Sequence, residues 1–169
     1  MDLCLAEIRD EAALRALLAV AVADATPEET MPPFEGPPGW TDRKQEFFME
    51  FFLPMVRSEE TAVFAVKVDG AVAGFFRLRR MPDADGTVAE TGTWLGRSYR
   101  GKGIGAAAFD AVLAEAARRG YTRVVADTTP QNVAALGLLR RGRARLRQEA
   151  GKIYAEIAIG PGYATDLDK

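Results

Sequence analysis

The sequence predicts a mixed α/β domain in which a largely antiparallel sheet is flanked by helices. Three observations indicate this class. Val- and Phe-rich segments joined by tight-turn signals form a run of strands in the middle of the chain, two helical segments precede that run, and a helix, strand, helix and hairpin follow it. The 169 residues are 27% charged and 48% hydrophobic, which suits one domain over residues 1–169.

The first third of the chain is predicted to hold one strand and two helices. Residues 3–9 alternate in polarity as a strand does, and Asp10 can cap a helix whose apolar residues recur at helical spacing. Residues 26–41 contain five prolines and two glycines, so we expect a loop without regular structure. A second helix is expected from residue 42, and Pro54 should bend or end it.

The middle and the end of the chain carry the remaining strands and helices. Residues 61–81 read as a hairpin around Asp69-Gly70, residues 82–86 as another turn and residues 87–96 as a third strand of a meander. A glycine-rich loop leads into a helix over residues 105–120, closed by Gly120. A buried strand at 122–127, a short helix at 133–139 and a hairpin around Gly151 complete the order.

Composition excludes several classes of function. The formal net charge of −2 argues against bulk binding to nucleic acid or an anionic membrane. No apolar run reaches membrane-spanning length, and the N-terminal residues lack the pattern of a signal peptide, so we expect a cytoplasmic protein. The single cysteine, Cys4, rules out a disulfide within the chain and is expected to be a small buried residue. The absence of histidine removes the commonest general base and metal ligand, and no metal is predicted.

The segment RSYRGKGIGAAAF, residues 97–109, indicates a phosphate-binding loop. A nucleotide P-loop is excluded, because Gly105 is followed by alanines and not by Lys and Ser or Thr. The dinucleotide fingerprint G-x-G-x-x-A is satisfied by Gly101, Gly103 and Ala106. However, the strand before it belongs to an antiparallel meander, and too little chain follows for a doubly wound sheet.

The hexapeptide Arg100-Gly101-Lys102-Gly103-Ile104-Gly105 resembles the Arg/Gln-x-x-Gly-x-Gly/Ala pyrophosphate loop of the GNAT N-acetyltransferase superfamily. Its glycines would let consecutive backbone N–H groups face a diphosphate, and the following helix would add its positive N-terminal end. The strand before the loop and the Asn132-x-x-Ala135 sequence after it also match, so the resemblance covers roughly residues 60–140. It implies the GNAT acyltransferase fold, with splayed fourth and fifth strands, and acetyl-CoA as the cofactor.

The resemblance also implies which residues hold the cofactor. Backbone groups of the fourth strand would pair with the pantetheine arm, and the Leu95 N–H would stabilise the oxyanion. Asn132 would bond the cofactor arm, although a helix N-cap is an equally natural role for it. The predicted cofactor-binding residues are Trp94, Leu95, Gly96, Arg100, Gly101, Lys102, Gly103, Ile104, Gly105, Ala106, Asn132, Ala135 and Leu139.

The catalytic groups are less clearly indicated. Glu90 lies near the position at which some family members carry a catalytic glutamate, and a solvated strand glutamate is the alternative. The tyrosine that often protonates the leaving thiolate in the family is replaced by Leu139. Tyr154 could substitute for it, but packing in the core is the interpretation that we favour. The arginine-rich residues 140–147 could meet the 3′-phosphate of CoA, and a charged edge strand is the favoured alternative.

The acceptor is expected to lie against residues from the first third of the chain. Phe34, Glu35, Trp40 and Phe52 are candidates for lining the substrate wall, although the phenylalanines of the second helix are expected to be mostly core. We expect an N-acetyltransferase that moves an acetyl group directly from acetyl-CoA to a primary amine, of a small molecule in preference to a protein N-terminus. A protein N-terminal acetyltransferase, a non-catalytic CoA-binding sensor and an NAD-binding enzyme are the alternatives. The length of the acyl chain and a homodimer are left open.

Overall fold

The computed structural model describes residues 1–82 and 85–160 of the chain. These form two compact units. Unit 1 comprises Met1–Arg77 and Thr93–Ile104, and unit 2 comprises Leu78–Gly92 and the chain from Gly105 onward. The predicted turn at residues 82–86 includes positions outside the described residues.

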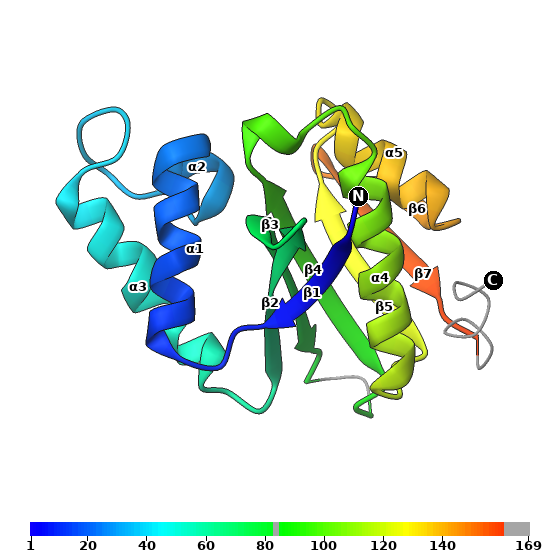
Figure 1. Cartoon of the computed structure of the whole chain (residues 1–169). Coiled ribbons are helices and arrows are strands. Elements are labelled where there is room, and N and C mark those ends of the chain that lie inside the picture. Colours follow the sequence, from blue (N-terminus) through cyan, green and yellow to red (C-terminus); the bar gives the residue numbers. More distant parts are fainter. Residues whose placement is uncertain (83–84, 161–169) are drawn as a thin grey trace. The chain divides into compact units, whose positions relative to one another are not determined.

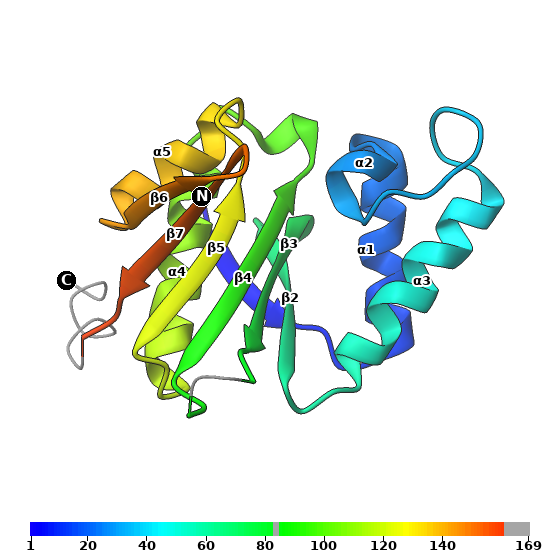
Figure 2. The ribbon, with the colours of Figure 1, turned by 180° about the vertical axis from the view of Figure 1, so that it is seen from behind.

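The elements follow the predicted order of strands and helices (Figures 1 and 2). They are β1 (Leu3–Glu7), α1 (Glu11–Asp24), α2 (Pro27–Thr30), α3 (Asp42–Val56), β2 (Thr61–Val68), β3 (Ala71–Arg80), β4 (Val88–Leu95), the 3₁₀ turn η1 (Arg97–Tyr99), α4 (Ile104–Arg118), β5 (Arg123–Thr128), α5 (Val133–Arg141), β6 (Arg145–Glu149) and β7 (Lys152–Ala158).

The seven strands of the described chain are hydrogen-bonded in the order β1-β2-β3-β4-β5-β7-β6. The pairs β1–β2, β5–β7 and β6–β7 are antiparallel, whereas β4 and β5 are parallel. The parallel pairing is short, running from Val88↔Arg123 to Glu90↔Val125, although both strands continue beyond it. The predicted fold class, a largely antiparallel sheet flanked by helices, is confirmed.

Unit 1 is built on the predicted capping of α1 and on an aromatic core. The Asp10 side chain accepts a hydrogen bond from the Ala13 N–H (2.8 Å), so the helix begins where the sequence indicates. Of the four phenylalanines of α3, Phe48 and Phe52 are fully buried, and Phe47 and Phe51 are half-buried against the same core. α3 contains Pro54 and ends at Val56, within one turn of that proline.

Two expectations for unit 1 are wrong. The loop at residues 26–41 does contain regular structure, since α2 occupies Pro27–Thr30. A capping box stabilises it: the Thr26 Oγ1 accepts from the Glu29 N–H, and the Glu29 carboxylate accepts from the Thr26 N–H. Cys4 is exposed and not buried, because β1 is the terminal strand in the sheet order and Cys4 lies on its solvent-facing side.

In unit 2, α4 covers one face of strands β5 and β7 (Figures 1 and 2). Gly142, which follows α5, packs so closely there that an added Cβ would lie 2.9 Å from Phe109 of α4 and 3.1 Å from Ile157 of β7. The predicted final hairpin is present, with β6 beside β7 at the end of the strand order. No helix of the described chain is long and apolar enough to cross a membrane.

Candidate active site

Strand β4 ends close to β3 because Gly74 has no side chain. A Cβ at Gly74 would lie 2.3 Å from the Trp94 carbonyl oxygen and 2.8 Å from the Leu95 Cδ2 atom. Trp94 itself is buried, and its ring stacks on Phe75 with 6.4 Å between ring centroids. Its Nε1 is buried and has no hydrogen-bond partner among the described residues. The predicted cofactor-binding end of β4 is therefore held rigidly from one side.

The main-chain groups of Leu95 point away from β3. The next residue, Gly96, donates its N–H to the Ala73 carbonyl in β3 (2.9 Å), and consecutive residues of a strand direct their main-chain groups to opposite edges. Both the N–H and the carbonyl of Leu95 therefore face the other edge of β4. The pairing of β4 with β5 stops at Glu90, five residues earlier.

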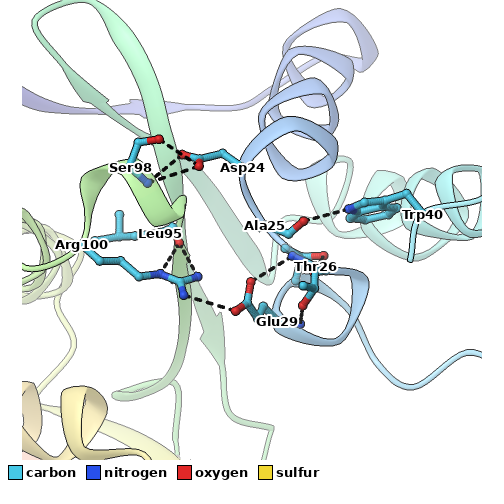
Figure 3. Close-up of polar contacts among 9 residues, drawn as sticks. Asp24, Ala25, Thr26, Glu29, Trp40, Leu95, Ser98 and Arg100 are labelled. Carbon is cyan, nitrogen blue, oxygen red and sulfur yellow. Dashed lines mark hydrogen bonds and ion pairs between the residues drawn. The ribbon is translucent and has the colours of Figure 1, made fainter. Parts of the chain in front are cut away.

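Arg100 binds the protein's own main chain (Figure 3). Its Nε and Nη2 atoms donate to the Leu95 carbonyl at 3.0 and 2.8 Å, and its Nη1 donates to Glu29 at 3.2 Å. The hydrogen bond from Arg100 lowers the pKa of the Glu29 carboxyl below its ordinary value of 4.5. Arg100 was expected to contact phosphates, and in this structure its side chain links the loop to β4 and α2.

Asp24, the last residue of α1, holds the start of the same loop (Figure 3). Its carboxylate accepts from the Ser98 N–H (3.1 Å) and from the Ser98 Oγ (2.9 Å). Gly96 lies so close that an added Cβ would be 2.4 Å from Asp24 Oδ2. Glycine at position 96 therefore serves this contact within the protein.

The glycine loop has the geometry of an anion cradle. Gly101 and Gly103 have φ angles of +71° and +78°, and a Cβ on either would meet no atom within 4 Å. The amides of Lys102 and Gly103 donate to no acceptor within the described chain, and α4 begins at Ile104. Backbone N–H groups without an acceptor, beside glycines of positive φ at the start of a helix, suit a diphosphate, so these residues fit the pyrophosphate of acetyl-CoA.

The downstream residues of the predicted cofactor set lie in unit 2. Asn132 is the N-cap of α5, where its Oδ1 accepts from the Ala135 N–H (3.1 Å). The side-chain oxygen is thus occupied, which agrees with the N-cap alternative. Leu139 is only 4% exposed and packs in the core of unit 2, so this residue contributes packing at the position where the resemblance implies a tyrosine.

The predicted acceptor-wall residues belong to unit 1. Phe34 stacks on Phe47 (4.5 Å between centroids), and the Trp40 Nε1 donates to the Ala25 carbonyl (3.1 Å, Figure 3). Phe52 is 2% exposed and lies in the aromatic core, whereas Glu35 is exposed. Of this set, Phe52 has the least surface to offer a substrate.

Unit 2 contains a cavity of about 470 Å³ that brings the two candidate catalytic side chains together. Glu90 of β4 and Tyr154 of β7 both line it, and Tyr154 is 37% exposed. The favoured expectation that Tyr154 packs in the core is wrong, because it lies on the sheet face opposite the buried Ala155 and Ile157. Glu90 is half-buried and accepts a hydrogen bond from Arg79 Nη2 (3.0 Å).

Sequence reasoning did not identify most of the other residues around this cavity. The remaining lining residues are Met81, Val125, Ala126, Asp127, Arg145, Arg147, Ala155 and Glu156. They come from strands that are far apart in the sequence and adjacent in the sheet. The alternation of charged and apolar residues in β5, β6 and β7 does indicate which residues share a face of each strand. It does not indicate which strands are neighbours, and strand pairing is what brings these residues around one cavity.

Comparison with known proteins places the chain in a family. The sequence model of the acetyltransferase (GNAT) family matches residues 20–143. No curated protein sequence matches the chain significantly.

Solved structures of other acetyltransferases share the fold at low sequence identity. The GNAT domain of S. lividans PAT is 15% identical, with a TM-score of 0.71 over 91% of this chain and 89% of that one. The Campylobacter jejuni N-acetyltransferase PseH, in complex with acetyl coenzyme A, is 12% identical, with a TM-score of 0.68 over 94% of this chain and 100% of that one. A Salmonella typhimurium acetyltransferase that modifies the N-terminal serine of a ribosomal protein is 18% identical, with a TM-score of 0.68 over 94% of this chain and 95% of that one.

The family match covers most of the chain, and the glycine loop and the short β4–β5 pairing agree with it. The NAD-binding alternative is thereby excluded. This chain belongs to the acetyltransferase (GNAT) family and is an N-acetyltransferase that uses acetyl-CoA.

Proposed function

We propose that this enzyme acetylates a primary amine of a small molecule, by direct transfer in a ternary complex. The observation that carries the proposal is the cavity of unit 2, which Glu90 and Tyr154 both line. A cavity of about 470 Å³ falls within the range of small-molecule sites. In the reaction the amine nitrogen forms a bond to the acetyl carbon, the carbon–sulfur bond breaks, and the thiolate of CoA leaves.

Glu90 is proposed as the general base. An alkylamine with a pKa near 10.4 is only about 0.04% neutral at pH 7, a handicap of about 4.6 kcal/mol that a base can relieve. The chain has no histidine, and a carboxylate is ionised at neutral pH, so a carboxylate is the side chain that suits this role best. Glu90 is half-buried, lines the cavity and is oriented by Arg79, and these features support its role, acting directly or through water.

The Leu95 N–H is proposed to stabilise the oxyanion. The alternation of main-chain groups directs this N–H away from β3, and Arg100 fixes the adjacent carbonyl by two hydrogen bonds. Gly101, Gly103 and the exposed Lys102 are proposed to hold the diphosphate of acetyl-CoA. Acetyl-CoA supplies the activated thioester when it binds.

Tyr154 is proposed as the proton donor to the leaving thiolate. Tyr154 is partly exposed at the cavity, so its hydroxyl is available. Leu139, at the position where the resemblance implies a tyrosine, is buried and has no hydroxyl. A thiol pKa of about 8.5 makes CoA a good leaving group, so we expect only about a 10-fold loss of turnover in Tyr154→Phe.

The test is release of free thiol from acetyl-CoA in the presence of a broad panel of amines that includes small molecules and peptides. Glu90→Gln should lower kcat by about 100-fold, flatten the acid limb of the pH–rate profile and leave acetyl-CoA affinity unchanged. Arg79→Gln is the matched control, since it breaks the same ion pair but keeps the carboxylate, and the acid limb of its pH–rate profile should remain.

An unaltered pH profile in Glu90→Gln would remove Glu90 as the base. Turnover confined to peptides would identify a protein N-terminal acetyltransferase instead. Binding of acetyl-CoA without turnover of any amine would identify a CoA-binding sensor.

A further inference from the structure

Among the described residues, the charged side chains that line the cavity of unit 2 have partners of opposite charge, with one exception. Each carboxylate has a basic partner at 3.0–3.2 Å: Glu90 with Arg79, Asp127 with Lys152, and Glu156 with Arg123. Of the two arginines, Arg147 is paired with Glu149 (2.5 Å) and lies 5.2 Å from the centre of the Tyr154 ring. The main chain of Arg145 is part of the β6–β7 ladder, but its side chain has neither an ion pair nor a hydrogen bond within the described chain. The uncompensated charge at the cavity is therefore positive.

The sheet register places Arg145 in line with the proposed base. Glu90 pairs with Val125, Val125 with Glu156, and Glu156 with Arg145, so these four residues form one row across β4, β5, β7 and β6. Residues in such a row project from the same face of a sheet. Neighbouring strands lie about 4.8 Å apart, so the main chains at the two ends of this row are roughly 14 Å apart.

We propose that the acceptor carries an acid group as well as its amine, and that Arg145 binds this group. The inference rests on the proposed function, because the amine is assigned to the Glu90 end of the row. A purely cationic acceptor would face carboxylates that already have partners and an arginine that repels it. An acceptor with a carboxylate at its far end supplies the missing anion, and a guanidinium recognises a carboxylate through two parallel hydrogen bonds. The length of the row favours amine and acid groups separated by a chain of several bonds over an α-amino acid.

The experiment compares ε-aminocaproate with its amide, ε-aminocaproamide, which has the same amine and chain but no charge at the far end. In the parent enzyme kcat/KM should favour the acid by about 10-fold or more. Arg145→Gln should abolish this preference and leave the KM of acetyl-CoA unchanged. Arg9→Gln removes the same charge from an exposed side chain of unit 1 and should keep the preference.

Calorimetric titration of the enzyme–CoA complex with ε-aminocaproate gives a readout that does not depend on turnover. Arg145-dependent binding without acetylation would support the acid site and overturn the proposed function. Equal use of acid and amide by the parent, or an acid preference that survives in Arg145→Gln, would overturn the inference alone. The KM for acetyl-CoA gives a further outcome that would overturn the inference. If Arg145→Gln has a higher KM than the parent for acetyl-CoA, and the same KM as the parent for 3′-dephospho-acetyl-CoA, then Arg145 binds the 3′-phosphate of the cofactor.

Discussion

In unit 1 the charged side chains near the end of β4 bind the protein's own main chain, whereas in unit 2 the charged side chains surround a cavity. Arg100 donates to the Leu95 carbonyl of β4, and Asp24 of α1 accepts from the Ser98 N–H of η1, the turn that precedes the glycine loop. Arg145 and Glu90 instead line an open volume. Under the proposed function, the loop of unit 1 holds the cofactor, and the cavity of unit 2 selects the acceptor.

The largest expected effect is a loss of acetyl-CoA affinity when a negative charge is placed in the glycine loop. Gly103→Glu should weaken acetyl-CoA binding by about 100-fold, close to 3 kcal/mol, because a carboxylate there repels the diphosphate. Isothermal titration measures this. Gly120→Glu is the matched control: Gly120 also has a positive φ (+85°) and open space around it, at the other end of α4. An equal loss of affinity in both variants would mean that the loop does not bind the diphosphate.

Gly74→Ala should destabilise unit 1 by about 3 kcal/mol, since its Cβ would collide with the Trp94 carbonyl oxygen and force β3 and β4 apart. Chemical denaturation checks this value. Gly137→Ala is the control, because a Cβ in the middle of α5 meets no atom within 4 Å and should stabilise the helix by up to about 1 kcal/mol. Unchanged stability in Gly74→Ala would show that the close approach of the two strands is not required.

Arg100→Gln should raise the KM of acetyl-CoA by about 10-fold, because the Leu95 carbonyl and the start of the loop lose their support. A double-mutant cycle with Glu29→Gln separates positioning from direct phosphate binding. If Arg100 positions the loop, the effects of the two substitutions on KM should not be additive. The coupling energy between Arg100 and Glu29 should stay below about 1 kcal/mol, because both side chains are partly exposed. Strict additivity, together with an equal effect of Lys102→Gln, would assign Arg100 to the phosphates instead.

The smallest effect concerns the pH dependence of stability. The pKa of Glu29 is lower in the folded protein than its ordinary value of 4.5, so its contribution is fully present above that pH and is lost as the pH falls through the lowered value. Glu29→Gln should therefore reduce the acid-induced loss of unfolding free energy, by less than about 1 kcal/mol. Urea titrations at neutral and acidic pH measure the difference, and identical curves for parent and variant would contradict it.

Sequence reasoning succeeded wherever local chemistry decides the structure. Asp10 caps α1, the Asp69-Gly70 turn joins β2 to β3, and the loop after β4 has the positive φ angles that its glycines indicate. The capping box of α2 was equally local, but the density of prolines around it obscured the signal. The predictions of burial were wrong for two side chains whose exposure depends on strands far away in the sequence. Cys4 is exposed because β1 is a terminal strand, and Tyr154 is exposed because of the face on which β7 places it.

The order of elements, the glycine loop and the resemblance that points to acetyl-CoA can be read from the sequence, because they depend on residues close together in the chain. The contact of Arg100 with Leu95, the burial of Leu139 and the cavity that Glu90 shares with Tyr154 depend on how the chain folds. Strand pairing and register bring such groups together. They are set by the packing of the whole sheet, which no local pattern encodes.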